Sequence, residues 1–260
     1  MKKTALITGA CINTGVAIVE KFASEGYNVV FTGRNSERVM AKEAEYRAQF
    51  PDVNIIGYTI DSLLDERTVD EESVERLFAE LDRQGITLNT VVLNAADQGL
   101  NMKVFENPLT DFARVFNTNV TWNFCICEHA AARMKEIGGG SIVFINSNTA
   151  YRAIPDRIAY IASKGGQLGL MRALALDLGK YNIRVNAVLP GMIKTDRWEK
   201  NPDFYKNVPS RFTPIGDVAV GADIADAAWY FAEMARNTTG AELVVDGGNT
   251  IQLYPIIKDE

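Results

Sequence analysis

Tyr160 and Lys164 are the two residues whose types and spacing most directly suggest chemistry. They stand four positions apart in the segment Tyr-Ile-Ala-Ser-Lys, so a helix would place them on one face, one turn apart. A free tyrosine has a pKa near ~10, and a cation held beside it stabilises the phenolate. The pair therefore suggests a general acid–base. Because Tyr-x-x-x-Lys is also common by chance, the surrounding residues decide its meaning.

A serine hydroxyl precedes this pair. Ser147 lies at the end of the apolar run 141–146, where it could hydrogen-bond a substrate carbonyl. It could equally cap a helix or a turn. Four further residues follow the next apolar run: Pro190, Gly191, Ile193 and Thr195. By themselves these residues predict only a turn.

The N-terminal segment 4–24 reads as a strand, a glycine turn and a helix. Such a turn lets backbone N–H groups approach a pyrophosphate, and the start of the helix adds positive potential. Glycines occur in many strand–helix turns, so the motif is weak by itself. The residues that it would bring to a dinucleotide are Gly9, Cys11, Asn13, Thr14 and Gly15.

Three further positions strengthen the prediction of a dinucleotide site. The second apolar run ends in Gly33, Arg34 and Asn35. An acidic residue there would bind the ribose 2′-hydroxyl of NAD, whereas a glycine followed by arginine favours the 2′-phosphate of NADP(H). Arg34 could also be a plain surface charge. The ends of the third and fourth runs add Asp61, Ser62, Asn94, Ala95 and Ala96 at the edge where ligands bind an open α/β sheet.

Seven short apolar runs alternate with amphipathic stretches along the chain. Within each run, apolar and polar residues do not alternate strictly, which is typical of strands buried on both faces. We therefore expect an α/β fold: a doubly wound, Rossmann-type, seven-stranded parallel sheet with helices on both faces, in one domain spanning 1–260. Residues 62–72 read as a solvated acidic loop, and about 192–219 as a lid over the substrate. The strands are expected at 4–8, 28–32, 54–60, 90–94, 141–146, 184–189 and 242–246.

Taken together, these motifs resemble the single-domain short-chain dehydrogenase/reductase family over nearly the whole chain. The resemblance rests on the glycine turn, Asp61, Asn94-Ala95, Asn119, Ser147, Tyr160 with Lys164, Pro190-Gly191 with Ile193 and Thr195, and the segment 245–248 (Val-Asp-Gly-Gly). It implies interconversion of a carbonyl and an alcohol by hydride transfer.

The resemblance also implies roles for four catalytic residues. Tyr160 would exchange the proton with the carbonyl oxygen, and Ser147 would orient that oxygen. Lys164 would bind the nicotinamide ribose and lower the pKa of Tyr160. Asn119 would hold a water that links Lys164 to solvent.

This sequence departs from the family pattern at several positions. Asn13 replaces a glycine, although asparagine tolerates positive φ better than most residues. Leu93 and Ala96 replace an asparagine and a glycine, and Asn146 replaces the first of two paired serines. All four catalytic positions are retained.

The amino-acid composition limits the kinds of partner that the protein is expected to bind. The net charge of −6 and the pI of about 5.1 argue against nucleic acid, whose binding needs lysine and arginine to neutralise phosphates. No run approaches the ~20 apolar residues of a membrane span. The three scattered cysteines indicate no disulfide framework, which agrees with the cytoplasm. His129 is the only histidine, so we expect it to pack on a helix, and we predict no metal site.

The substrate is the least determined feature. Position beside the catalytic groups, or in the lid, gives the pocket walls as Gln98, Asn148, Tyr151, Ala153, Ile154, Trp198, Phe204, Tyr205 and Phe212. These suit a bulky apolar, steroid-like or aryl, ketone or alcohol, or else they merely pack the lid. The alternatives are a 3-oxoacyl-thioester reductase and a catalytically silent nucleotide-binding regulator. The family resemblance further implies a homotetramer, or a dimer, built on the helical stretches 111–137 and 158–181.

Overall fold

The computed structural model describes residues 2–99, 102–106, 108–206 and 211–255, with backbone alone at 197, 199 and 204. Within these residues a seven-stranded, wholly parallel sheet has the order β3-β2-β1-β4-β5-β6-β7. Its strands are β1 (Thr4–Ile7), β2 (Asn28–Gly33), β3 (Ile55–Thr59), β4 (Thr90–Leu93), β5 (Gly140–Ile145), β6 (Ile183–Pro190) and β7 (Glu242–Val245). All seven expected strands are confirmed. β1 and β4 are buried throughout, which explains their continuous apolar sequence.

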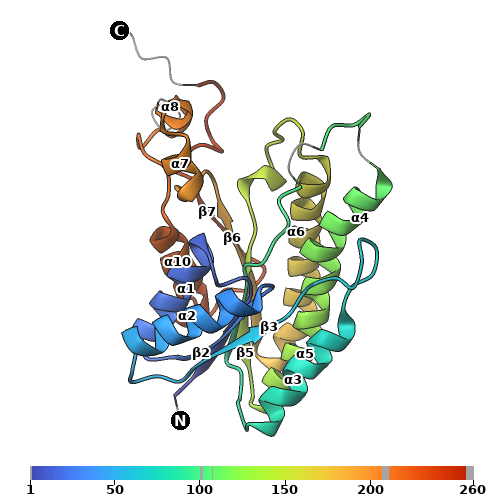
Figure 1. Ribbon diagram of the computed structural model, residues 1–260, viewed down its shortest axis with the longest axis vertical. Coiled ribbons are helices and arrows are strands. Elements are labelled where there is room, and N and C mark those ends of the chain that lie inside the picture. The colour runs from blue at the N-terminus through green and yellow to red at the C-terminus, as the bar shows by residue number, and fades with distance from the viewer. Residues whose placement is uncertain (1, 100–101, 107, 207–210, 256–260) are drawn as a thin grey trace.

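Helices cover both faces of the sheet, as Figure 1 shows. One face carries α1 (Asn13–Ser24), α2 (Ser36–Gln49) and α10 (Gly221–Trp229), and the other carries α3 (Glu71–Arg83), α4 (Leu109–Phe116), α5 (Trp122–Glu136) and α6 (Ile158–Leu178). Each layer has its own apolar core. Phe22 belongs to the first core and Phe78 to the second, and neither is exposed. The doubly wound architecture is thereby confirmed.

The long helical stretch expected around 111–137 is interrupted. Between α4 and α5 the chain forms a π-helical turn at Asn117–Thr121. Such turns are rare and often accompany functional sites. This turn contains Asn119, which is fully buried. In the middle of α5, His129 stacks on Phe78 with ring centroids 5.2 Å apart, in agreement with a packing role.

The acidic segment 62–72 is a turn whose residues 64–68 are exposed, as expected of a solvated loop, and its two ends are bridged. Leu63 and Val69 form an antiparallel bridge, and Leu64 N donates to Thr68 O at 2.9 Å. Asp70 then caps α3 by accepting from Ser73 N at 2.9 Å. The short turn thus leads directly from β3 into α3.

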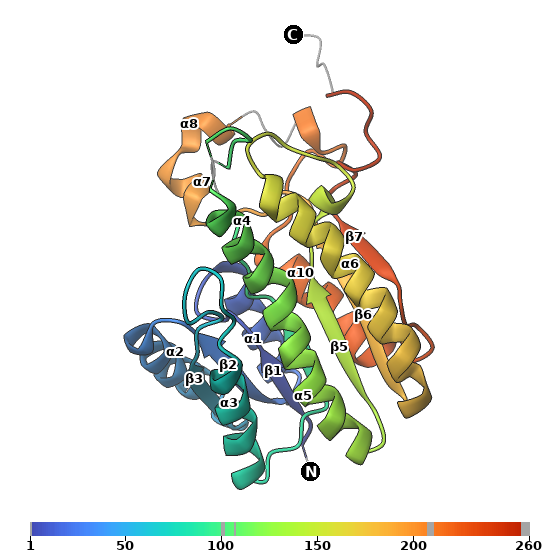
Figure 2. The same cartoon turned by 90° about the vertical axis from the view of Figure 1, so that its right-hand side faces the viewer.

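Segment 192–219 rises above the carboxyl ends of the strands (Figure 2). It contains α7 (Asp196–Lys200) and α8 (Pro202–Tyr205). A parallel bridge joins Ile193 to Ala219, and Lys194 N donates to Ala219 O at 2.8 Å. These contacts bring the two ends of the segment together at its base. In the part of the chain that the structure describes, no helix is both long and apolar enough to cross a membrane.

Candidate active site

The structure brings Ser147, Tyr160 and Lys164 together. Ser147 follows β5, and the other two lie in the first two turns of α6. The Ser147 hydroxyl acts on the Tyr160 phenol and favours a lower pKa for it. Lys164 Nζ lies 5.6 Å from the centroid of the Tyr160 ring. The i, i+4 spacing on one helix therefore gives the predicted neighbourhood.

The hydrogen bonds around Ser147 fix the direction in which its hydroxyl donates. Ser147 Oγ accepts from Thr149 Oγ1 at 2.9 Å and from Thr149 N at 3.2 Å. A hydroxyl has two lone pairs and one hydrogen. With both lone pairs used, the Ser147 hydroxyl keeps its hydrogen for a further acceptor. Ser147 also acts to lower the pKa of Tyr160.

Burial outweighs this contribution. It is the largest influence on Tyr160, whose pKa is raised from its ordinary value, while Ser147 and the charge of Arg157 oppose the rise. Burial also lowers the pKa of Lys164, to about 7. That Lys164 lowers the pKa of Tyr160 stays a prediction.

Lys164 has two protein acceptors for its three N–H groups. Its Nζ donates to Ile145 O at 2.9 Å and to Gln167 Oε1 at 3.1 Å. The residue is only 1% exposed. One N–H therefore remains for a ligand in the site.

Asn119 is bound entirely by protein groups. Its side chain bonds both backbone groups of Asp97 at 2.8 Å and donates to Ser163 Oγ at 2.9 Å. The backbone carbonyl of Asn119 accepts from Gln167 Nε2 at 2.6 Å and from Asn123 Nδ2 at 2.8 Å. Both lone pairs of that carbonyl are used. The position expected for a water between Lys164 and Asn119 is thus taken by the Gln167 amide.

Gln167 and Asn146 are the residues that the sequence reasoning missed here. Asn146 Nδ2 donates to Gln167 Oε1 at 3.0 Å and to Lys164 O at 2.9 Å. Its Oδ1 accepts from Ser147 N at 2.7 Å. A signal existed in the sequence, because Gln167 is polar, lies one turn after Lys164 and faces the buried side of α6.

The glycine turn forms the expected cradle at the start of α1. A Cβ at Gly9 would stand 2.8 Å from Ala95 Cα, and one at Gly15 would stand 2.4 Å from Gly9 O. Asn13 has φ of 49°, so asparagine does take the positive-φ position. α1 has no side-chain cap and no acidic residue in its first turn. Its first N–H groups and its dipole are therefore available to an anion such as a pyrophosphate.

The residues after β4 support this turn. Asn94 Nδ2 donates to the carbonyls of Thr8 and Gly9 at 3.1 and 3.0 Å. Thr8 Oγ1 accepts from the backbone N–H groups of Asn94 and Ala95, both at 3.0 Å. Ala96 is exposed beside them. Asn94 therefore shapes the turn, and the small residues leave space in front of it.

Other expected cofactor residues differ in where their side chains lie. Cys11 Sγ lies 2.5 Å from the position of a Cβ at Gly33, so this buried thiol packs under Gly33. Ser62 Oγ lies 3.1 Å from Thr118 Oγ1 and is also buried. Asp61 is exposed at the end of β3, and Thr14 is half-buried in α1.

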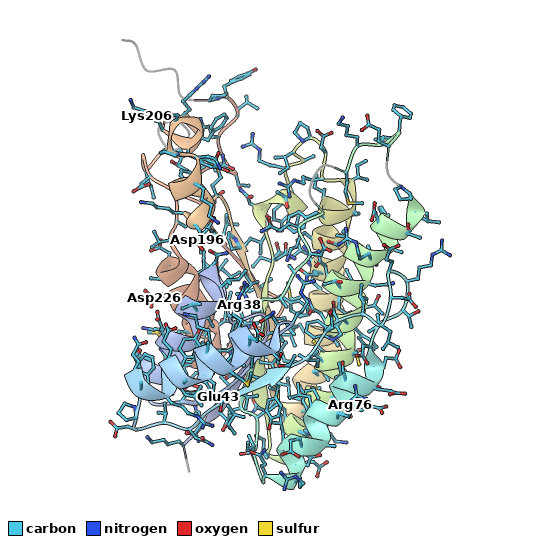
Figure 3. All side chains as sticks on the ribbon, in the orientation of Figure 1. Arg38, Glu43, Arg76, Asp196, Lys206 and Asp226 are labelled. Atoms are coloured by element: carbon cyan, nitrogen blue, oxygen red, sulfur yellow. The ribbon has the colours of Figure 1, made fainter. Side chains whose placement is uncertain are left out.

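Two arginines stand where β2 passes into α2. Arg34 and Arg38 are exposed, and no acidic side chain in the described ranges pairs with either. Asn35 caps α2 by accepting from Arg38 N at 2.8 Å. Figure 3 labels Arg38 at the end of α2 nearest the centre of the molecule. Sequence reasoning named Arg34 and missed Arg38, although both belong to the same helical start.

The residues after β6 lie beside the same edge. Gly191 N donates to Val245 O at 3.0 Å, and a Cβ at Gly191 would stand 2.5 Å from Asp246 Cβ. Pro190 ends β6. The backbone carbonyl of Thr195 accepts from Trp198 N at 2.8 Å at the start of α7. Together with Ile193 at the base of the lid, these residues extend the cradle toward α7.

The expected substrate residues divide into two groups. Trp198 and Tyr205 stack with centroids 4.4 Å apart, and Ile154 and Phe212 are exposed; their place in the substrate pocket stays a prediction. Asn148 instead donates to Asn249 Oδ1 at 2.9 Å. The side chain of Phe204 lies outside the described residues.

Tyr151 is not brought to the site. Its hydroxyl is hydrogen-bonded to Glu242 on β7, and Glu242 also pairs with Arg172 on α6 at 2.5 Å. The hydroxyl is thereby held at the start of β7, because its partner Glu242 lies there.

A family model described as enoyl-(acyl carrier protein) reductase matches residues 9–250. A 3alpha-hydroxysteroid dehydrogenase of Mediterraneibacter gnavus is 33% identical over 248 residues, which cover 94% of this chain and 96% of that protein. The chain belongs to the short-chain dehydrogenase/reductase family. As a member of this family it is an oxidoreductase.

Solved structures of this dehydrogenase/reductase fold are similar along the whole chain. ElxO with NADP bound has a TM-score of 0.87 at 28% identity, covering 97% of this chain and 100% of that one. NAD+-bound xylitol dehydrogenase has a TM-score of 0.81 at 28% identity, covering 95% and 98%. The first of these proteins holds NADP and the second holds NAD+.

Proposed function

We propose that this dehydrogenase/reductase interconverts a ketone or aldehyde and an alcohol with NADP(H), using Tyr160 as its acid–base. The observation that carries the proposal is that the buried Lys164 Nζ lies 5.6 Å from the centroid of the Tyr160 ring, in a site that also holds the Ser147 hydroxyl. A proton donor and an oriented hydrogen bond then meet one carbonyl oxygen, as general acid catalysis requires.

Bound NADP(H) supplies the hydride or accepts it. The chain does the remaining work. Tyr160 gives its proton to the carbonyl oxygen during reduction and takes it back during oxidation. Ser147 turns its hydrogen to that oxygen, and Lys164 offers its remaining N–H to the nicotinamide ribose. Asn119 fixes the turn that supports them through its bonds to Asp97 and Ser163.

NADP(H) is favoured over NAD(H) by the guanidinium groups of Arg34 and Arg38. Among the described residues, no acidic side chain forms an ion pair with either guanidinium. A guanidinium can bind a phosphate through two parallel hydrogen bonds. No carboxylate stands at Gly33 to accept from a ribose 2′-hydroxyl. The uncapped start of α1 accommodates the pyrophosphate, as described above.

The substrate that we propose is a bulky apolar ketone or alcohol. The stacked pair Trp198 and Tyr205, with Ile154 and Phe212, offers apolar surface above the acid–base. The similarity to a hydroxysteroid dehydrogenase agrees with this class. A 3-oxoacyl-thioester substrate is the second candidate, supported by the acyl carrier protein in the description of the matching family model.

Only small molecules and further copies of this chain are proposed as partners. The net charge of −6 does not suit a polyanion such as nucleic acid. The three cysteines are free, which agrees with the reducing cytoplasm. Exposed apolar side chains on α6, β7 and the C-terminal segment support a homotetramer: Leu176, Val244, Ile251 and Leu253.

The deciding experiment follows NADPH absorbance with steroid, sugar, aryl-ketone and oxoacyl-thioester substrates. We expect turnover by the wild type, and a loss of at least about 100-fold in kcat in Tyr160→Phe with unchanged NADPH affinity. Equal inactivity of both proteins across the panel, while NADPH still binds, would instead support the silent regulator. The best substrate identifies the class.

A further inference from the structure

Tyr46 is the largest completely buried side chain among the described residues. It lies near the end of α2, and its hydroxyl donates to the backbone carbonyl of Ala10 at 2.8 Å. Ala10 belongs to the glycine turn, 36 residues earlier in the chain. A buried tyrosine usually finds a partner for its hydroxyl. Here that partner is the loop that the cofactor is expected to bind, so α2 is hydrogen-bonded directly to the glycine turn.

This hydrogen bond orients the peptide group between Ala10 and Cys11. The described peptide bonds are all trans, and a planar trans peptide directs its C=O and its N–H to opposite sides. Because the Ala10 carbonyl points to the Tyr46 hydroxyl, the Cys11 N–H points away from Tyr46. No group in the described part of the chain accepts from that N–H. The glycine turn therefore keeps a donor for a ligand, and Tyr46 sets its direction.

Packing fixes both ends of this contact. A Cβ at Gly15 would stand 2.7 Å from Ala10 Cα, and Ala10 N donates to Thr32 O at 2.9 Å. The ring of Tyr46 meets that of Phe31 edge to face, with centroids 5.3 Å apart. Ala10 is thus held by α1, by β2 and by the Tyr46 hydroxyl together. Only the last of these contacts can be removed by deleting a single atom.

The face of α2 that carries Tyr46 also carries an arginine proposed for the 2′-phosphate. Arg38, Lys42 and Tyr46 follow one another at four-residue intervals in α2, so they lie along one side of the helix. Lys42 Nζ lies 5.6 Å from the centroid of the Tyr46 ring. This side of α2 therefore acts on the nucleotide in two ways. Arg38 would distinguish NADP(H) from NAD(H), whereas Tyr46 acts on the turn that serves the pyrophosphate, which both nucleotides contain.

We propose that Tyr46 is a positioning residue for the cofactor, whose hydroxyl holds the glycine turn in the orientation that binds the pyrophosphate. The proposal rests on the nucleotide binding proposed above and deepens it. Tyr46 is fully buried, so it acts through the turn and not by contact with the nucleotide. Its effect therefore falls on the affinity for both nucleotides and not on the transfer of hydride or proton.

Two matched substitutions test the proposal. Tyr46→Phe removes the hydroxyl and keeps the ring in the core. Tyr27→Phe is the control, because Tyr27 is 5% exposed in the same apolar core and its hydroxyl bonds Glu233. Tyr27 precedes β2, at the opposite end of the sheet from the turn that follows β1. The measurements are the dissociation constants of NADPH and NADH, the melting temperature, and kcat with saturating NADPH and the ketone that the wild type reduces best.

We expect Tyr46→Phe to weaken the binding of NADPH and NADH alike, each by about 3- to 10-fold, as the loss of one neutral hydrogen bond predicts. Its kcat should stay within about 2-fold, because the change affects binding alone. Tyr27→Phe should lower the melting temperature and leave both affinities unchanged.

Three results would overturn the proposal. The first is unchanged affinity in Tyr46→Phe. The second is an equal loss of affinity in Tyr27→Phe, because a loosened core would then be sufficient. The third is a loss confined to NADPH, which would place the effect at the 2′-phosphate.

A measurement on the wild type keeps the proposal testable if Tyr46→Phe does not fold. The Cys11 N–H should gain an acceptor from the bound nucleotide. Its amide hydrogen exchange should therefore slow by at least about 5-fold with saturating NADPH or NADH. The amide of Gly26, which already donates to Ala23 O at 3.0 Å between α1 and β2, should not change. Unchanged exchange at Cys11 would contradict the proposed orientation of the turn.

Failure of this inference is distinguishable from failure of the proposed function. If the wild type binds NADPH and Tyr46→Phe binds it equally well, the inference alone is overturned. If the wild type binds neither NADPH nor NADH, the proposed function is overturned and the inference with it.

Discussion

Lys164 Nζ donates to Gln167 Oε1 at 3.1 Å, one turn along α6. The lysine is therefore held by an amide that has no charge of its own. Neither residue is more than 1% exposed. Both hydrogen-bond acceptors that the described residues give the Lys164 ammonium are neutral, and burial lowers its pKa to about 7.

The free energy of unfolding should rise with pH because of Lys164. Its pKa falls from an ordinary value of 10.5 to about 7 on folding. Between these values the unfolded chain binds more protons than the folded chain, so stability increases with pH. At ~1.36 kcal/mol per pKa unit, we expect the wild type to gain about 2 kcal/mol relative to Lys164→Met between pH 7 and 9.

Urea denaturation at a series of pH values measures this difference. Lys180→Met removes an exposed lysine from the end of the same helical segment and should keep the wild-type slope. Parallel curves for the wild type and Lys164→Met would show that the lysine is not destabilised by burial.

NADPH affinity should depend on Arg34 and Arg38 jointly. A hydrogen bond to a charged group contributes about 1.5–3 kcal/mol. Each single substitution by aspartate should therefore weaken NADPH binding by roughly 10- to 100-fold, and the double substitution by more, with NADH much less affected. Titration of each cofactor by fluorescence measures both affinities.

Arg76→Asp is the matched control for this pair. Arg76 lies on α3, well away from Arg38 in Figure 3, and it pairs at the surface with Glu72. The charge change is the same, so it should leave the preference for NADPH over NADH unchanged. Equal losses for NADH and NADPH in the Arg34 and Arg38 variants would refute a role in binding the 2′-phosphate.

Assembly should depend on the outer face of α6. Leu176 is 83% exposed there, and a charge placed in a buried interface costs far more than one at a free surface. Leu176→Asp should lower the sedimentation coefficient from that of a tetramer to that of a smaller species. Met40→Asp, at a 63% exposed position on α2, should not change it. A monomeric wild type, or an unchanged Leu176→Asp, would refute the assembly proposed here.

The sequence by itself determined the seven strands, their order along the chain and the neighbourhood of Tyr160. Strands buried on both faces appear as continuous apolar runs, and the spacing of Tyr160 and Lys164 makes them neighbours on any helix. The glycine turn was equally readable, because Asn13 and the small residues around Gly9 and Gly15 meet backbone constraints that are local.

Only the tertiary structure decided which polar groups face one another. Asn119, Asn146 and Gln167 come from three different elements, and their hydrogen bonds depend on how α6 packs against β5 and the π-helical turn. Tyr151 was expected beside the substrate and is bonded to Glu242 instead. Burial, which lowers the pKa of Lys164, belongs to the packed molecule and has no counterpart in local spacing.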